Sequence, residues 1–258
     1  MTPTPPTSAP ALQLTGLVKR FGEKYAVADL DLTVPVGSFY GLVGPNGAGK
    51  TTTLSMATGL LRPDAGTAEI CGVEVWQDPV RAKAMVGVLS DGVRLFDRLT
   101  GAQLIMYTGM MFGLPRAELA QRTDDLLQLM DLTGSAGVAV VDYSAGMTKK
   151  IALACALVHA PRLLVLDEPF ESVDPVSAAN IEDALRGYAS SGGTVIVSSH
   201  SMDLVQRMCD HVAIIAAGRV VVAGTVDEVR GEATLQDRFL ELVGGRHRTE
   251  GPAWLRQS

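Results

Sequence analysis

Residues 44–52, GPNGAGKTT, decide how the rest of this sequence is interpreted. They follow the apolar run FYGLVG (39–44) and precede a segment of helical composition. In the pattern G-x-x-x-x-G-K-[ST], glycines let backbone N–H groups turn inward around phosphates at a helix N-terminus. The preceding strand and the following helix favour this interpretation over an ordinary glycine-rich turn. The residues predicted to hold a nucleotide are Gly44, Pro45, Asn46, Gly47, Ala48, Gly49, Lys50, Thr51 and Thr52.

Within this loop, two side chains have specific roles in such a site. Lys50 is placed to reach the β- and γ-phosphates, and Thr51 is placed to offer its hydroxyl to Mg²⁺. We therefore expect ATP and Mg²⁺ as the ligands of the site, with Lys50 taking part in catalysis.

A second apolar run, LLVLDEP (163–169), ends in two carboxylates. Removing a charge from water is costly without a partner, so a site with a cation explains these residues better than an acidic strand end. Asp167 is predicted to hold Mg²⁺ through its water shell, and Glu168 to stand next to the water that attacks the γ-phosphate. His200 follows another apolar run, TVIVSS (194–199), and could be structural or could contact the γ-phosphate.

The alternation of strand-like and helical runs predicts an α/β fold with buried parallel strands. The strand-like runs are FYGLVG, LLVLD, TVIVSS and VAIIAAGRVVVAG. Between about 95 and 160 the strand signal stops, and a helix is expected to begin at Pro115. Its apolar positions at helical spacing are Leu119, Leu126, Leu127 and Met130. We interpret this region as a helical subdomain inserted into the sheet domain.

Residues 143–147, YSAGM, precede another helical stretch. Ser144 is well placed as an N-cap, and the positive end of the helix behind it suits an anion. The sequence nearby offers no evident anionic partner for this helix end.

Composition excludes several classes of protein. The chain has 258 residues, of which 47% are hydrophobic, so it can bury one substantial core. A net charge of -6 argues against binding of nucleic acid through a broad basic surface. The apolar runs are broken well before the roughly 20 residues that a membrane helix needs. The three cysteines lack metal-site spacing and are expected to be reduced, mostly buried thiols.

The ordered set of motifs resembles the ATP-binding cassette ATPases over about residues 11 to 224. In chain order the set comprises Phe21 before a glycine, the phosphate loop, Asp91 where the family normally has Gln, YSAGM, the acidic strand end, ESVD (171–174) and His200. The resemblance implies a phosphate-loop ATPase core with a mostly parallel sheet, an N-terminal antiparallel β portion and the helical subdomain. One ATPase domain is expected over 11–244, with a disordered tail at 1–10 and a flexible tail at 245–258.

The resemblance also implies roles for individual residues. Phe21 would stack on adenine, although a core or loop aromatic is the open alternative. Ser144 and Gly146 would bind the γ-phosphate of the nucleotide held by the other subunit, despite the departures Ala145 and Met147 from the usual LSGGQ. Glu168 would be the catalytic base and His200 the γ-phosphate sensor, and Asp174, which ends ESVD, would belong to the nucleotide site.

Asp91 is a further departure from the family pattern. A carboxylate is a good Mg²⁺ ligand, but it lacks the amide donor of Gln and is one methylene shorter. It is predicted either to contact Mg²⁺ or to face solvent in a loop.

The function implied by the resemblance is that of an ATPase subunit of a membrane transporter, of the drug- and lipid-export type. The expected partners are a separate transmembrane permease and a second cassette, identical or paralogous, at the cytoplasmic face of the membrane. A cassette ATPase acting on ribosomes or DNA is the alternative, disfavoured by the acidic charge, the single cassette and the short insertion. A GTP switch is excluded because the chain has no N-K-x-D segment.

Overall fold

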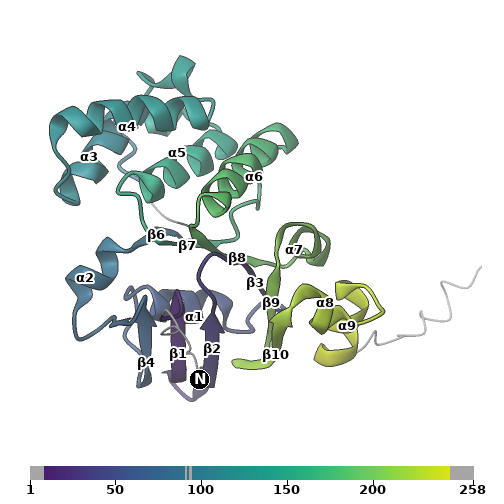
Figure 1. Cartoon of the computed structure of the whole chain (residues 1–258). Coiled ribbons are helices and arrows are strands. Elements are labelled where there is room, and N and C mark those ends of the chain that lie inside the picture. The colour runs from purple at the N-terminus through teal and green to yellow at the C-terminus, as the bar shows by residue number, and fades with distance from the viewer. Residues whose placement is uncertain (1–8, 91, 93–94, 245–258) are drawn as a thin grey trace, which may run out of the picture.

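A computed structural model describes residues 9–90, 92 and 95–244 (Figure 1). Within these residues the strands form a six-stranded sheet in the order β10-β9-β3-β8-β7-β6 and a four-stranded sheet in the order β2-β1-β4-β5. The strands are β1 (Leu12–Phe21), β2 (Lys24–Val34), β3 (Phe39–Val43), β4 (Ala65–Ile70), β5 (Val73–Glu74), β6 (Val86–Leu89), β7 (Leu163–Asp167), β8 (Thr194–Ser199), β9 (His211–Ala216) and β10 (Arg219–Thr225).

The six-stranded sheet determines where the functional residues lie. Strands β6, β7, β8, β3 and β9 pair in parallel, and β10 pairs antiparallel with β9 as a hairpin. β3, β7 and β8 are buried along their whole length, as their continuous apolar sequences predict. Because parallel strands end at the same edge of a sheet, the segments after β3, β7 and β8 meet there.

One face of this sheet packs on helix α1 (Lys50–Ala57) and on the antiparallel four-stranded sheet. Their shared core includes Leu42, Val165 and Ile196 from the large sheet and Leu14 and Leu54 from the opposite layer. Helix α2 (Pro79–Ala84) lies between β5 and β6 in the chain. The antiparallel portion expected at the N-terminus is therefore present, and it holds α1 against the large sheet.

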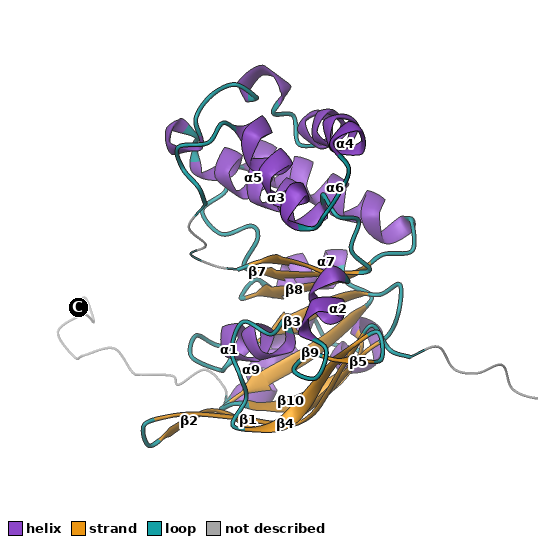
Figure 2. Ribbon diagram, turned by 90° about the vertical axis from the view of Figure 1, so that its left-hand side faces the viewer, coloured by secondary structure: helices purple, strands orange, loops and turns teal. Residues whose placement is uncertain are grey.

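The other face carries most of the helices, which form a lobe above the sheet (Figure 2). The lobe comprises α3 (Gly101–Met111), α4 (Arg116–Leu129), α5 (Ala145–Leu157) and α6 (Pro175–Ser190). Helix α7 (Met202–Met208) packs directly against β3 and β8, and the short helices α8 (Val226–Arg230) and α9 (Leu235–Val243) follow β10. Helix α5 contacts α3, α4, α6 and β6, so it joins the lobe to the sheet. None of the helices in the described residues is long and apolar enough to cross a membrane.

Several local sequence predictions are confirmed. Pro115 is the N-cap of α4, and Leu119, Leu127 and Met130 are buried in the core of the lobe. Ser144 caps α5 through its hydroxyl, which accepts from the Met147 N–H at 3.2 Å. The run 212–224 divides into β9 and β10, with a turn at Ala217 and Gly218 that both have positive φ. Of the tails expected at 1–10 and 245–258, residues 1–8 and 245–258 lie outside the described residues.

Two helical glycines predict opposite effects of the same substitution. Gly187 is exposed in α6, and a Cβ added there meets no atom within 4 Å, so Gly187→Ala should stabilise the protein by about 0.5–1 kcal/mol. Gly109 in α3 is buried, and an added Cβ would lie 2.1 Å from Leu119 Cδ2. Gly109→Ala should therefore destabilise it, by about 1–3 kcal/mol. Urea unfolding of the two variants measures both effects, and equal shifts in the same direction would contradict the packing of α3 on α4.

Candidate active site

The phosphate loop joins the end of β3 to the start of α1, in the strand–loop–helix order that the sequence predicted. Gly47 and Gly49 have φ values of 78° and 106°, which side chains other than glycine rarely adopt. An added Cβ at Gly49 would also lie 2.4 Å from the Ala26 carbonyl oxygen. Gly49 is the N-cap of α1 and has no side chain to cap it, so the first N–H groups of the helix are left for an anion.

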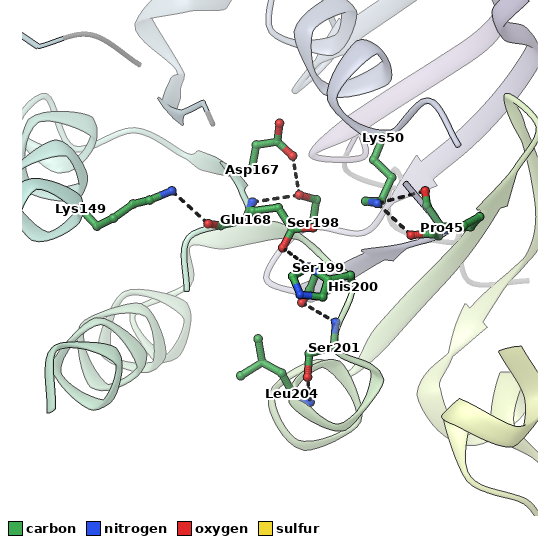
Figure 3. Close-up of polar contacts among 11 residues, drawn as sticks. Pro45, Lys50, Lys149, Asp167, Glu168, Ser198, Ser199, His200, Ser201 and Leu204 are labelled. Carbon is green, nitrogen blue, oxygen red and sulfur yellow. Dashed lines mark hydrogen bonds and ion pairs between the residues drawn. The ribbon is translucent and has the colours of Figure 1, made fainter. Parts of the chain in front are cut away.

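Lys50 points back over its own loop (Figure 3). Its ammonium group donates to the carbonyl oxygen of Gly44 at 2.8 Å and to that of Pro45 at 3.4 Å. The residue is only 7% exposed, and a buried ammonium group needs such partners. The loop therefore holds the charge at its centre, where the phosphates of a nucleotide can replace weaker carbonyl partners.

Asp167, the last residue of β7, is 3% exposed. Its Oδ1 accepts a hydrogen bond from the Ser198 hydroxyl, whereas its Oδ2 is buried and has no hydrogen-bond partner among the described residues. Asp167 and Thr51 line the same small cavity, of about 10 Å³. A buried carboxylate oxygen near a hydroxyl suits a hard cation such as Mg²⁺, so these residues fit the ion.

Glu168 is fixed from several directions. Its N–H donates to Ser198 Oγ at 3.0 Å, its carbonyl oxygen accepts from Lys149 Nζ at 3.0 Å, and its Oε2 lies 3.1 Å from His200 Nδ1. Its φ of 46° is in the left-handed region, which is unfavourable for a residue with a side chain. Figure 3 shows these contacts converging from β7, β8 and α5. The carboxylate is thus held in one orientation with His200 beside it.

A cavity of about 670 Å³ brings most of the predicted site together. Its lining residues are Phe21, Lys24, Ala26, Asn46, Gly47, Ala48, Gly49, Lys50, Thr51, Thr52, Glu168, Glu171 and His200. Phe21 is 54% exposed at the end of β1, so its ring is not part of the core and has a face free to stack on a base. The volume and the mixed aromatic and cationic lining suit a nucleoside triphosphate.

The YSAGM segment lies elsewhere. Of the described residues lining the cavity, none comes from 143–147. Ser144 is exposed, whereas Gly146 is buried so closely that an added Cβ would lie 2.7 Å from Ser177 Oγ and 2.8 Å from Asp174 Oδ2. Folding brings Asp174 of ESVD beside this helix end, so the anionic neighbour that the adjacent sequence does not offer comes from a distant segment. Ala145 does not have positive φ, so it fits the helix without strain.

Asp174 is the N-cap of α6, where its Oδ1 accepts from the N–H groups of Val176 and Ser177. Hydrogen bonds from the Ser177 N–H and hydroxyl hold the pKa of the Asp174 carboxyl below its usual value. Asp174 therefore stays ionised and caps α6, while its Oδ2 lies close to Gly146 of α5. Asp91 lies outside the described residues.

The structure brings to the site several residues that the sequence did not predict there, among them Ser198, Lys149 and Lys24. Ser198 and Lys149 bind Glu168, and Lys24 lines the cavity next to Phe21. Ser198 precedes His200 by two positions, but its pairing with Asp167 depends on the register of β7 and β8, which adjacent residues do not reveal. Nothing in the sequence links Lys149 to Glu168, because the two are joined only by the packing of α5.

Comparison with known proteins agrees with this geometry. Residues 27–171 match the model of the ABC transporter family, which is more than half of the chain. The chain belongs to the ABC transporter family. A daunorubicin resistance ATP-binding protein, DrrA3, of Streptomyces coeruleorubidus is 35% identical over 222 residues, which are 86% of this chain and 70% of that protein. A Nod factor export ATP-binding protein I of Ralstonia nicotianae is 37% identical over 222 residues, with 86% and 69% covered.

Among solved structures, the ATP binding subunit of an ABC transporter has a TM-score of 0.84 and 27% identity, covering 90% of this chain and 99% of that one. The fold is therefore that of an ABC ATPase cassette, as predicted, and the chain is the ATP-hydrolysing part of an ABC transporter. The family model ends at residue 171, before His200, so the role of His200 depends on the geometry above.

Two substitutions separate nucleotide binding from hydrolysis. Lys50→Ala removes the charge at the centre of the loop and should abolish ATP binding. Glu168→Gln keeps size and most contacts but removes the carboxylate, so ATP binding should persist while turnover falls by roughly 10²- to 10⁴-fold. Equilibrium binding of ATP and steady-state ATPase assays measure the two effects. Turnover of Glu168→Gln at the wild-type rate would show that the base is another residue.

Proposed function

We propose that this chain powers the export of a small molecule or lipid, as a peripheral subunit on the cytoplasmic face of a membrane. The relatives named as drug resistance and Nod factor export proteins support export. The observation that carries the mechanism is that the phosphate loop, Phe21, Glu168 and His200 line one cavity, whereas Ser144 is not among its lining residues.

In the proposed reaction, the chain's own residues bind and orient the substrate. Phe21 stacks on adenine, and the loop N–H groups and Lys50 hold the phosphates. Glu168 accepts a proton from the attacking water, and His200 fixes the Glu168 carboxylate and contacts the γ-phosphate. When Mg²⁺ is bound, by Thr51 and Asp167, it neutralises charge on the phosphate oxygens. The contact of Asp91 with Mg²⁺ stays a prediction.

The remaining side of the site is assigned to a second cassette. Ser144 is exposed at the N-terminus of α5, where helix N–H groups and the positive helix end suit a phosphate. Gly146 and Asp174 hold that helix end in place against α6. Two chains arranged head to tail would each offer Ser144 to the nucleotide on the phosphate loop of the other chain.

Mixing two inactive variants tests this shared site. Lys50→Ala disables the phosphate loop, and Ser144→Arg places a bulky side chain at the start of α5. A mixed dimer carries both lesions in one site and neither in the other, so the mixture should regain ATPase activity that neither variant has alone. The control mixes Lys50→Ala with Glu168→Gln, whose lesions share one face of the cavity, so that both sites stay defective. Absence of recovery in both mixtures, with mixed dimers proven by affinity tags, would contradict the shared site.

A second surface fits the membrane subunit. An apolar groove of about 350 Å³ lies between the sheet domain and the helical lobe, and Leu60, Phe96 and Phe112 line it. Phe112 stacks on His159, with ring centroids 3.8 Å apart, and burial lowers the pKa of the His159 imidazole, which favours the neutral ring. Lys83 is the charged side chain among the described residues that line the groove. Leu95 and Phe96, which follow β6, line this groove. The family resemblance assigns the segment after β6 to contact with the membrane subunit.

A charge in the groove should release the chain from membranes. Leu60 is 59% exposed, so Leu60→Asp should leave the fold intact but reduce recovery with salt-washed membranes by about fivefold or more. The matched control is Val80→Asp, at an 81% exposed position of α2 outside the groove. Sedimentation of both variants with membranes and with ribosomes measures the effect. Equal losses in both variants, or recovery of the wild type with ribosomes only, would contradict the proposed membrane partner.

A further inference from the structure

Ser198 is a fully buried residue near the end of β8, at 0% exposure. In the parallel ladder between β7 and β8 it is the partner of Asp167. Neighbouring side chains in register point to the same face of a sheet, which here is the face covered by α1. A polar side chain at this position is therefore placed beside the buried carboxylate by the backbone alone.

The Ser198 hydroxyl makes two hydrogen bonds with opposite roles. It donates to Asp167 Oδ1 at 2.5 Å and accepts from the Glu168 N–H at 3.0 Å. A carboxylate can only accept and an amide N–H can only donate, so the two partners use both capacities of one hydroxyl. Figure 3 shows Ser198 between the two acidic residues.

The first bond determines how Asp167 can act. Since Oδ1 is engaged by Ser198, Oδ2 is the oxygen left without a hydrogen bond in the described structure, and it is buried near Thr51. Rotation of the Asp167 carboxylate would break the bond to Ser198 inside the protein, where an unpaired polar group is unfavourable. The bond therefore fixes the direction of the free oxygen.

The second bond acts on the backbone that carries Glu168. This residue has a positive φ of 46°, so its conformation needs support from surrounding contacts. The bond from its N–H to Ser198 fixes the peptide plane between Asp167 and Glu168. The Ser198 hydroxyl thus orients both the side chain of Asp167 and the backbone of Glu168.

We infer that Ser198 is a positioning residue for ATP hydrolysis, whose hydroxyl sets the direction of the Asp167 oxygen and the turn at Glu168 together. This inference rests on the proposed roles of Asp167 and Glu168. It makes the metal site and the general base interdependent, because a change at either residue alters the geometry of the same hydroxyl.

Thr and Val at position 198 provide an isosteric test, since they differ in shape very little and only Thr has a hydroxyl. Ser199→Ala is the matched control. Ser199 is also buried, but it follows on the opposite face of β8, and its Oγ accepts from the Ser201 N–H rather than contacting an acidic residue. Thermal unfolding without nucleotide establishes which variants fold, and Ser198→Ala replaces Ser198→Val if the latter does not.

The readouts are ATP affinity in EDTA, the gain in ATP affinity when Mg²⁺ is added, and kcat. Ser198→Val should bind ATP in EDTA like the wild type. Either its Mg²⁺-dependent gain in ATP affinity or its kcat should fall by roughly 10- to 100-fold, which is the usual effect of removing a group that orients a metal ligand. Ser198→Thr and Ser199→Ala should stay near wild type in all three.

Equal behaviour of the Val and Thr variants would overturn the inference, whether both are active or both are impaired, because the hydroxyl would then not matter. Asp167→Asn separates this failure from that of the proposed site. If Asp167→Asn loses the Mg²⁺-dependent gain while Ser198→Val keeps the gain and kcat, only the role of Ser198 fails. If Asp167→Asn leaves the gain unchanged, the metal role of Asp167 and the inference about Ser198 fail together.

Discussion

The register of three parallel strands is the constraint on which the site depends. β3, β7 and β8 pair so that Val43 lies beside Ser199 and Ser198 beside Asp167. A shift of one residue would turn Asp167 to the other face of the sheet, away from α1 and the phosphate loop. The large buried core on both faces resists that shift, since every apolar side chain of these strands would change face as well. Packing of the core therefore determines on which face of the sheet the polar side chains at the strand ends lie.

The site itself contains features that do not favour folding. Glu168 has a left-handed backbone, which costs about 1–2 kcal/mol. Asp167 keeps one buried oxygen that no group in the described part of the chain hydrogen-bonds, which costs about 1–3 kcal/mol. Hydrogen bonds of Glu168 with Ser198 and Lys149 offset part of this free-energy cost, and the loop carbonyls do the same for the buried charge of Lys50. In the proposed site, a cation and a phosphate chain would supply the groups that these atoms lack. The arrangement is therefore explained by ligand binding rather than by stability.

The sequence predicted the elements and motifs that are local. The phosphate loop, the acidic end of β7 and the cap at Ser144 could be read from adjacent residues, because glycine conformation, apolar runs and helix capping act over short distances. The contacts of Ser198 and Lys149 could not, because they depend on strand register and on how α5 packs. The same limit explains why Asp174 was not expected beside Gly146.

Helix α5 links the two halves of the proposed assembly. Ser144 caps its exposed N-terminus, and five residues later Lys149 donates to the Glu168 carbonyl oxygen of the same chain. Because a helix transmits displacement along its axis as a rigid element, movement of its N-terminus changes the position of Lys149 as well. A nucleotide bound against Ser144 by a second subunit would therefore act on this chain's own Glu168 through α5. In the proposed dimer, a single helix would then join the closing of one site to the geometry of the other.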